Sequence, residues 1–232
     1  LAEYHPTRTE TAMLERLAPE IARHIGAGAA LIEYGSGASR KIRALLEALR
    51  APAAYVPIDI SRQHLEMAAM RLAYDYPALP IAPVAGDYTA PLDLPVPAGA
   101  RPVIFFPGST IGNLAPDDAV ALLAQAAGRV GPRGLMLVGV DLKKDPVILH
   151  RAYTDRRGVT ADFNLNLLDR INRELDGNFR RAEFRHHAFY DAGAGRIEMH
   201  RVSVVAQRAT AAGQGFEFRA RGTIRTENYY EC

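Results

Sequence analysis

The sequence contains a single cysteine, Cys232, at its last position. One cysteine can form neither a disulfide within one chain nor a cysteine zinc site, so both kinds of structural cross-link are excluded within this sequence. No apolar run approaches the roughly 18 residues that a membrane-spanning helix needs, and no signal peptide is visible. We therefore expect a protein of the reducing cytoplasm that has no membrane partner.

Charge of one sign is not in excess either. The 28 basic and 26 acidic residues leave a formal net charge of +2, and basic residues come in short pairs such as Lys143-Lys144. Such pairs usually lie on solvated faces, so we expect no nucleic-acid partner. The seven histidines show no metal-ligand spacing, and we expect no metal. With 232 residues and 48% hydrophobic content, the chain can bury a sizeable core.

A strand, a glycine turn and a helix are predicted at residues 29–49. The apolar run at residues 29–32 leads into Gly35, Ser36 and Gly37, and helical spacing of apolar residues follows. Glycines are needed where a backbone turns tightly beside a ligand and helix N–H groups point at it. Arg40 stands where a dinucleotide fingerprint has its third glycine, which disfavours a dehydrogenase and favours S-adenosylmethionine as the cofactor.

Two further strands end in acidic residues. Residues 54–58 lead into Asp59, where a carboxylate at a strand tip can accept hydrogen bonds from a ribose diol. Residues 81–88 end in Gly86, Asp87 and Tyr88, an acid and an aromatic that suit an adenine ring. The alternative for both is local: a helix cap at Asp59 or at the serine two positions on, and a polar turn at 86–88.

A fourth apolar run, residues 103–106, predicts a strand buried on both faces. It leads into a loop of glycines and small polar residues, Pro107 to Asn113, which falls at the carboxyl ends of the strands where open α/β sheets bind ligands. A helix at 114–130 and a fifth strand at 134–140 follow. The first part of the chain therefore reads as a parallel α/β sheet.

The pattern changes after the fifth strand. Residues 148–175 are largely helical, and strands are predicted at 184–190 and 196–205, with a final pair at 216–220 and 223–227. We interpret this part as a cap over the ligand cleft. Alternation in the second strand places Met199 with Ile197 on one face, where a methionine usually serves the core. Ahead of the first helix, which Thr7 or Thr9 can cap, residues 1–8 could act as a lid.

Six motifs bring a family into view. In chain order they are Glu3-Tyr4-His5-Pro6-Thr7-Arg8, Glu33-Tyr34-Gly35-Ser36-Gly37, Phe106-Pro107-Gly108-Ser109-Thr110-Ile111-Gly112-Asn113, Gly139-Val140-Asp141-Leu142, Phe163-Asn164-Leu165-Asn166-Leu167-Leu168 and Arg196-Ile197-Glu198-Met199-His200. Over nearly its whole length the chain resembles the histidine-specific Nα-methyltransferases of ergothioneine biosynthesis, which convert L-histidine to hercynine. The resemblance implies a class I methyltransferase fold: a Rossmann-like α/β domain with an N-terminal lid at 1–147 and a smaller α+β substrate-binding cap at 148–232.

The resemblance also implies site residues. For S-adenosylmethionine they are the turn residues Gly35, Ser36, Gly37 and Lys41, the ribose-binding Asp59, and Asp87 with Tyr88 at the adenine. For the amino-acid substrate they are Gly108, Thr110 and Asn113 of the loop, Tyr153 at the carboxylate, Tyr4 near the imidazole, Met199 along the imidazole pocket, and Glu227, whose carboxylate recognises the ring.

Tyr229 departs from the family pattern, which usually has a serine there. A phenol can donate and accept hydrogen bonds, but it adds a ring to a pocket shaped around imidazole. A modified histidine or another amino acid is therefore an alternative substrate, and a non-catalytic homologue that only binds the cofactor is a further alternative.

The chemistry is an in-line displacement at the methyl group of a sulfonium, so the protein mainly aligns a neutral amine. We expect Gly108 and Asn113 to orient the nitrogen and a water or Tyr4 to take its proton. The resemblance implies three methyl transfers, with S-adenosylhomocysteine as the product of each, and we expect the protein to be a monomer.

Overall fold

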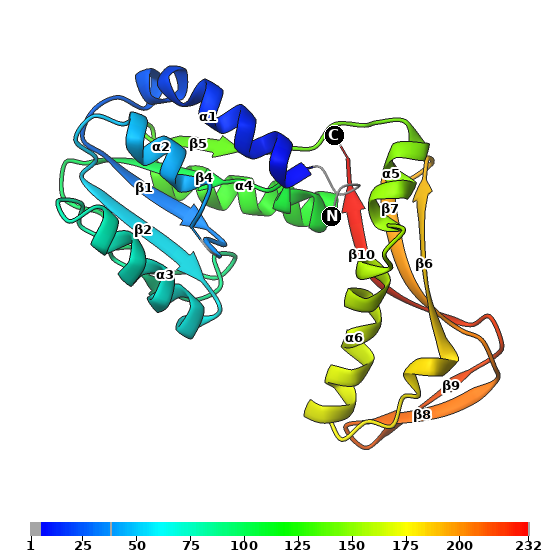
Figure 1. Ribbon diagram of the computed structural model, residues 1–232. Coiled ribbons are helices and arrows are strands. Elements are labelled where there is room, and N and C mark those ends of the chain that lie inside the picture. Colours follow the sequence, from blue (N-terminus) through cyan, green and yellow to red (C-terminus); the bar gives the residue numbers. More distant parts are fainter. Residues whose placement is uncertain (1–5, 38, 232) are drawn as a thin grey trace. The chain divides into compact units, whose positions relative to one another are not determined.

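The computed structural model describes residues 6–37 and 39–231. The chain forms two compact units, Pro6–Val140 and residues 141–231 (Figure 1). In the described part of the chain, no helix combines the length and the apolar character needed to cross a membrane. The assignment of cofactor binding to 1–147 and substrate binding to 148–232 stays a prediction.

The first unit is built on a five-stranded sheet in the order β3-β2-β1-β4-β5, with every neighbouring pair parallel. The strands are β1 Ala29–Tyr34, β2 Ala54–Asp59, β3 Val84–Ala85, β4 Arg101–Phe106 and β5 Leu135–Val138. All six residues of β1 are buried, as expected for a central parallel strand with both faces covered. Because the order reverses beside β1, the carboxyl ends of β1 and its neighbours form the crevice where such sheets bind ligands. The parallel α/β fold predicted from the sequence is confirmed.

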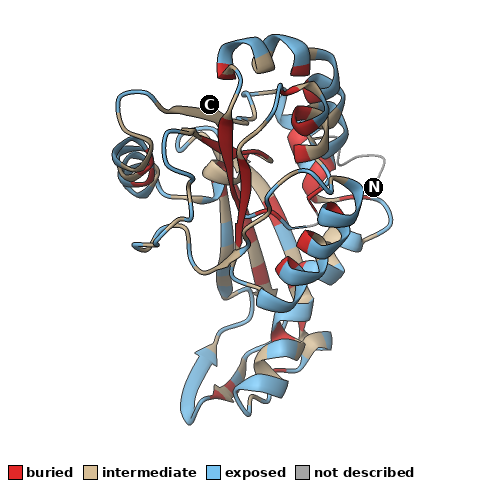
Figure 2. Cartoon of the chain, turned by 90° about the vertical axis from the view of Figure 1, so that its left-hand side faces the viewer, coloured by how far each residue is buried: buried red, intermediate tan, exposed pale blue. Residues whose placement is uncertain are grey.

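Helices cover both faces of this sheet. They are α1 Pro6–Ile25, α2 Ile42–Ala48, α3 Arg62–Asp75 and α4 Pro116–Val130, and the short 3-10 helix η1 spans Thr110–Asn113. Leu14, Leu45 and Leu72 of α1, α2 and α3 join one core cluster with Leu31 of β1. Leu122 of α4 joins a second cluster on the other face. Buried residues accordingly lie in the strands and on the inner sides of the helices (Figure 2).

Two local predictions in this unit need correction. Helix α1 spans Pro6–Ile25, so Thr7 and Thr9 lie inside it and neither caps it; a proline suits the first turn because its φ is already helical and its own N–H would have had no helical partner. The strand expected at 81–88 is reduced to Val84–Ala85 and one isolated bridge between Tyr55 and Ile81. Pro83 between them cannot donate to a sheet ladder, which explains the interruption.

The second unit packs two α-helices and one short 3-10 helix with an antiparallel sheet. The helices are α5 Pro146–Tyr153, α6 Val159–Glu174 and the short 3-10 helix η2 Arg181–Glu183, and the sheet, in the order β10-β7-β6, contains β6 Phe184–Asp191, β7 Arg196–Ser203 and β10 Thr223–Tyr230. A separate hairpin pairs β8 Gln207–Ala211 with β9 Gln214–Phe218. Two apolar clusters hold the unit together, one under α5 and one under α6.

The two final strands predicted at 216–220 and 223–227 are present as β9 and β10, with shifted bounds. Strand β9 pairs with β8, which the sequence pattern did not indicate, and β10 pairs with β7. Ala212 and Gly213 have φ angles of +49° and +74°, the backbone of a two-residue hairpin turn. Strand β8 was missed because its buried residues, Ala209 and Ala211, are too small to give a strong hydrophobic alternation.

Candidate functional site

The glycine turn after β1 has the backbone that its sequence predicts. Gly35 and Gly37 have φ angles of +70° and +49°, in the left-handed region that favours glycine. The N–H groups of Gly35 and Ser36 donate to the carbonyl oxygen of Ile58 at 2.9 and 3.1 Å. The N–H of Gly37 donates to Oδ2 of Asp59 at 3.1 Å. The turn and the predicted ribose-binding acid therefore lie together at the carboxyl ends of β1 and β2.

Two hollows border this turn. The first, of about 590 Å³, is lined by Thr7, Arg8, Thr11, Ala12, Glu15, Glu33, Gly35, Ser36, Ser39, Arg40, Lys41, Pro107, Gly108 and Thr110. The second, of about 570 Å³, is lined by Gly37, Ser39, Arg40, Arg43, Asp59, Ser61, His64, Met67, Ala68 and Arg71. Ser39 and Arg40 line both. The first unit thus provides space on either side of the turn for a ligand.

Glu10 of α1 ties together two predicted site residues. Its carboxylate accepts hydrogen bonds from the N–H of Gly108 at 2.7 and 2.9 Å and forms an ion pair with Lys41. A Cβ atom on Gly139 would lie 2.0 Å from Oε1 of Glu10, so the carboxylate fits only because residue 139 is glycine. Sequence reasoning missed Glu10 because a glutamate in an amphipathic helix gives no signal of a distant partner.

Glu33, beside the glycine turn, is a buried acid. It is 2% exposed, and the hydroxyl of Tyr55 donates to its carboxyl group. Burial raises the pKa of Glu33 to about 8, although the Tyr55 hydrogen bond and the charge of Lys41 act in the opposite direction. This side chain lines the first hollow as a neutral acid at neutral pH.

Asp87 and Tyr88 form a polar turn next to the glycine turn. Oδ1 of Asp87 accepts from the N–H and the hydroxyl of Thr89 at 2.8 and 2.7 Å, and these bonds lower the pKa of Asp87. The Tyr88 ring stacks on Tyr34 with centroids 5.0 Å apart. A Cβ atom on Gly35 would lie 3.8 Å from the Tyr88 ring. Their predicted contacts with adenine stay predictions.

Of the three site residues predicted in the loop after β4, two line the first hollow and one does not. Gly108, with φ of +83°, and Thr110 line the first hollow, and the Thr110 hydroxyl donates to the carbonyl of Pro107 at 3.0 Å. Asn113 ends η1, is exposed, and does not line that hollow. Substrate contacts by all three residues stay predictions.

In the second unit, four predicted substrate residues lie on one side of the sheet: three belong to strands, and Tyr153 ends helix α5, which packs on that side. Tyr153, Met199 and Tyr229 belong to one buried cluster, and the rings of Tyr153 and Tyr229 have centroids 6.0 Å apart. The register pairs Glu227 with Met199, so this exposed carboxylate lies on the same face. Met199 therefore also serves the core, as its alternation predicts. The predicted Tyr4 lies outside the described residues.

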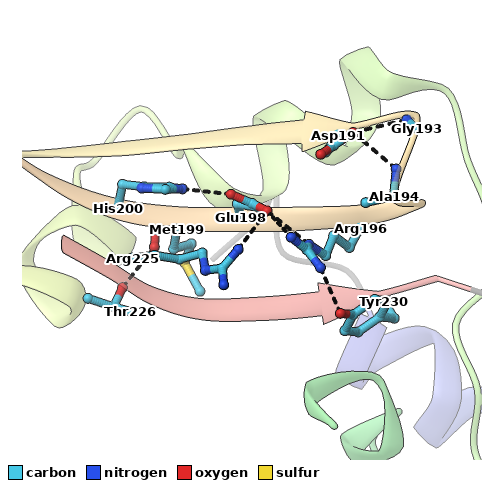
Figure 3. A network of polar contacts seen from close by, with 10 residues as sticks. All are labelled: Asp191, Gly193, Ala194, Arg196, Glu198, Met199, His200, Arg225, Thr226 and Tyr230. Atoms are coloured by element: carbon cyan, nitrogen blue, oxygen red, sulfur yellow. Dashed lines mark hydrogen bonds and ion pairs between the residues drawn. The ribbon is translucent and has the colours of Figure 1, made fainter. Parts of the chain in front are cut away.

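The opposite face of that sheet carries an ion network centred on Glu198 (Figure 3). Its carboxylate pairs with Arg196, with Nε2 of His200 at 2.8 Å and with Arg225 at 3.3 Å. Arg196 also donates to the Tyr230 hydroxyl at 2.8 Å. The bonds from Arg196 and then from His200 lower the pKa of Glu198 to about 2, so its carboxylate stays ionised and its ion pair with Arg225 joins β7 to β10.

Metal ligation has no obvious place in the described part of the chain. Among residues 6–37 and 39–231, no three side chains of histidine, cysteine, aspartate or glutamate come together in the arrangement that a metal centre needs.

Comparisons with known proteins place this sequence in a family. A family model described as "Histidine-specific methyltransferase, SAM-dependent" matches residues 1–231. The chain is 41% identical over 202 residues to the histidine N-alpha-methyltransferase of Mycobacterium tuberculosis, covering 86% of this chain and 62% of that protein. It is 39% identical over 232 residues to the same-named enzyme of Mycolicibacterium smegmatis, covering 98% and 72%. It is 36% identical over 178 residues to ergothioneine biosynthesis protein 1 of Neurospora crassa, covering 74% and 20%.

The chain thus spans under two thirds of the length of the first and third of these relatives. The family match nevertheless extends over residues 1–231, which is nearly all of the chain. This chain belongs to the histidine-specific, S-adenosylmethionine-dependent methyltransferases.

Proposed function

We propose that the protein transfers methyl groups from S-adenosylmethionine to the α-amino group of L-histidine, forming hercynine. The family and the names of the relatives support the reaction. The observation that carries the substrate assignment is the gathering of Tyr153, Met199, Glu227 and Tyr229 on one face of the β10-β7-β6 sheet. This face combines an apolar floor with a carboxylate and phenols, which suits a flat, polar imidazole ring.

The first unit fits the cofactor. The two hollows meet at the glycine turn. The N–H of Gly37 donates to the carboxylate of Asp59, and a ribose diol of the cofactor could donate to Asp59 in its place. Lys41 supplies a positive charge for the carboxylate of the cofactor. We assign the turn residues and Lys41 to the amino-acid end of the cofactor, Asp59 to its ribose, and Asp87 with Tyr88 to its adenine. When bound, the cofactor supplies a methyl group on a positively charged sulfur.

The protein's part in the reaction is to hold a neutral amine in line with that methyl group. A peptide α-amino group has a pKa of about 8, so the substrate nitrogen must lose a proton before it attacks. We assign Gly108, Thr110 and Asn113 to the orientation of the amino acid, Tyr153 to its carboxylate and Glu227 to its ring. The proton leaves to a water or to Tyr4.

Tyr229 favours a second candidate, a methyltransferase for a modified histidine or another amino acid. The phenol is 8% exposed and packs near Tyr153, so it reduces the volume available on this face. A homologue that binds the cofactor without turnover is the third candidate.

The test is a mass-spectrometric assay of the purified protein with S-adenosylmethionine and a panel of free amino acids. We expect methylated histidine, and we expect Glu227→Gln to lower kcat/KM for histidine about 10- to 100-fold, because a charged hydrogen-bond partner is lost. Glu217→Gln, an exposed residue of β9, is the matched control and should leave the rate unchanged. Methylation of a different amino acid would support the second candidate. Cofactor binding without any methyl transfer would support the third.

A further inference from the structure

The motif at residues 163–168 has no role in the assignments above, yet it contains a buried amide. Asn164 is 3% exposed on the inner side of α6. Asparagine is a poor helix former, and an amide buried without partners is costly, so its burial on this face points to specific partners.

Those partners form a continuous hydrogen-bond chain. Nε2 of His186 lies 2.9 Å from the carbonyl oxygen of Tyr153, which can only accept, so Nε2 carries the ring proton. Nδ1 of His186 therefore accepts, and Nδ2 of Asn164 donates to it at 2.8 Å and to the carbonyl of His200 at 3.3 Å. The other amide atom, Oδ1, accepts from the Thr226 hydroxyl at 2.9 Å. These hydrogen bonds thus connect Tyr153 at the end of α5 to Thr226 in β10.

Thr226, the last residue of this series of hydrogen bonds, forms a β-bulge in β10. Arg225 pairs with His200 and Glu227 pairs with Met199, so Thr226 is the extra residue on β10. Its Oγ1 also lies 3.0 Å from the carbonyl oxygen of Met199, so the single hydroxyl proton is shared between two acceptors and the bulge is held against β7 (Figure 3).

The bulge decides which face receives the predicted ring-recognition residues. In a regular ladder continuing from the Arg225–His200 pair, Glu227 would lie opposite Glu198 and Tyr229 opposite Arg196, on the face of the ion network. With the bulge, Glu227 lies opposite Met199 and Tyr229 opposite Ile197, on the face of Tyr153. A one-residue change of register moves every later side chain to the other face of a strand.

The backbone of α6 is fastened at the same place. Arg201, 2% exposed, donates from Nε to the carbonyl oxygen of Asn164 at 2.7 Å. Hydrogen bonds therefore fix both the backbone carbonyl and the side-chain amide of Asn164. As a result, Oδ1 faces Thr226 in a fixed position.

We propose that Asn164 and Thr226 are positioning residues for substrate recognition. Their hydrogen bond selects the bulged register that brings Glu227 and Tyr229 onto the face of Tyr153 and Met199. The structural part of this inference stands on the second unit alone, and its consequence for substrate choice rests on the proposed function.

The test compares three threonine variants of the whole protein. Thr226→Val removes the hydroxyl and keeps the branched shape, Thr226→Ser keeps the hydroxyl, and Thr223→Val is a matched control at an exposed position of the same strand. We expect Thr226→Val to lower kcat/KM for histidine about 10- to 100-fold, since a misplaced recognition group costs that much. Thr226→Ser should restore most of the activity, and Thr223→Val should match the wild type. The dissociation constant for S-adenosylhomocysteine should stay at the wild-type value in all three, because the glycine turn and Asp59 belong to the other unit.

A double-mutant cycle of Thr226→Val and Glu227→Gln distinguishes a misplaced Glu227 from a general loss of activity. If the register has changed, removing the Glu227 charge has no further effect in the Thr226→Val background, so the two effects are not additive. Full additivity, or wild-type kcat/KM in Thr226→Val, would overturn the proposal.

A crystal structure of Thr226→Val decides the register independently of activity. We expect Glu227 opposite Glu198, and Glu227 still opposite Met199 would overturn the inference. Thr226→Ala removes the same hydroxyl and gives the same comparison if the valine variant does not fold. A wild-type protein that methylates no histidine would contradict the proposed function. The crystal structure of Thr226→Val would still show whether the Thr226 hydroxyl selects the bulged register.

Discussion

Glu33 shows how burial changes the chemistry of one side chain. Its carboxyl group is 2% exposed and accepts a hydrogen bond from Tyr55, whose hydroxyl also lies 3.3 Å from that of Ser39. Because so little of this side chain is exposed, a carboxylate there would lose most of its hydration, and the neutral form is favoured up to a pKa of about 8. A neutral acid next to the glycine turn can donate a hydrogen bond as well as accept one.

The raised pKa of Glu33 predicts a pH dependence of stability. Because the folded protein holds this proton up to about pH 8 while the unfolded chain releases it near 4.5, the free energy of unfolding falls as pH rises through that window. The loss at the upper end is on the order of a few kcal/mol. Glu33→Gln, which keeps an acceptor for Tyr55, should show a flatter profile in urea unfolding measured from pH 5 to pH 8.

Glu20→Gln is the control for this measurement, since Glu20 is an exposed residue of α1. We expect it to leave the pH profile of the wild type unchanged. A Glu33→Gln protein with the same slope as the wild type would mean that Glu33 is ionised in the fold.

At the scale of elements, α1 is attached to the sheet by one carboxylate. Glu10 reaches the loop after β4 through Gly108 and the start of α2 through Lys41. Gly139, directly after β5, donates to the carbonyl of Phe106 at 2.9 Å and leaves room for the carboxylate. Three connections at the carboxyl ends of the strands thus meet at one side chain.

Gly139→Ala should therefore destabilise the first unit. The new Cβ atom would lie 2.0 Å from Oε1 of Glu10, so the carboxylate must leave its contacts with Gly108 and Lys41. We expect the free energy of unfolding to fall by about 1–3 kcal/mol in chemical denaturation. Gly128→Ala in α4 is the matched control, because nothing lies within 4 Å of its Cβ position. Alanine should stabilise that helix by up to about 1 kcal/mol, and equal stability of the two variants would argue against the packing described for Glu10.

At the scale of the molecule, each unit has its own core. The first unit has apolar clusters on both faces of its parallel sheet, and the second has clusters under α5 and under α6. The residues that we assign to the cofactor all lie in the first unit, within Pro6–Val140.

Cofactor binding should consequently protect the first unit most. With S-adenosylhomocysteine at 100 times its dissociation constant, we expect about 2.7 kcal/mol of stabilisation. Hydrogen exchange read by mass spectrometry should slow chiefly at residues 35–37, 39–41, 59–61 and 86–88. Asp59→Asn should weaken this protection. Asp75→Asn, which changes an ion pair between Asp75 at the end of α3 and Arg43 of α2, should retain it. Protection confined to residues 141–231 would contradict the assignment.

The sequence by itself determined the features that local pattern encodes. Apolar runs predict β1, β2 and β4. Gly35 and Gly37 predict a tight turn, because glycine readily adopts positive φ angles. Asp59 ends a neighbouring strand, and the rule that ligands bind at strand ends places it beside this turn. Period-two alternation correctly separates Met199 from Glu198 in β7, because both neighbours lie in one regular strand.

Only the tertiary structure decided the features that depend on distant partners. Glu10 meets Gly108 across 98 residues, and Thr226 meets Asn164 across 62. Neither contact has a local period, since each forms when separate elements pack. The face on which Glu227 lies follows from the second contact: alternation counts residues along a strand, but a bulge adds one, and the partner that holds the bulge lies in another element.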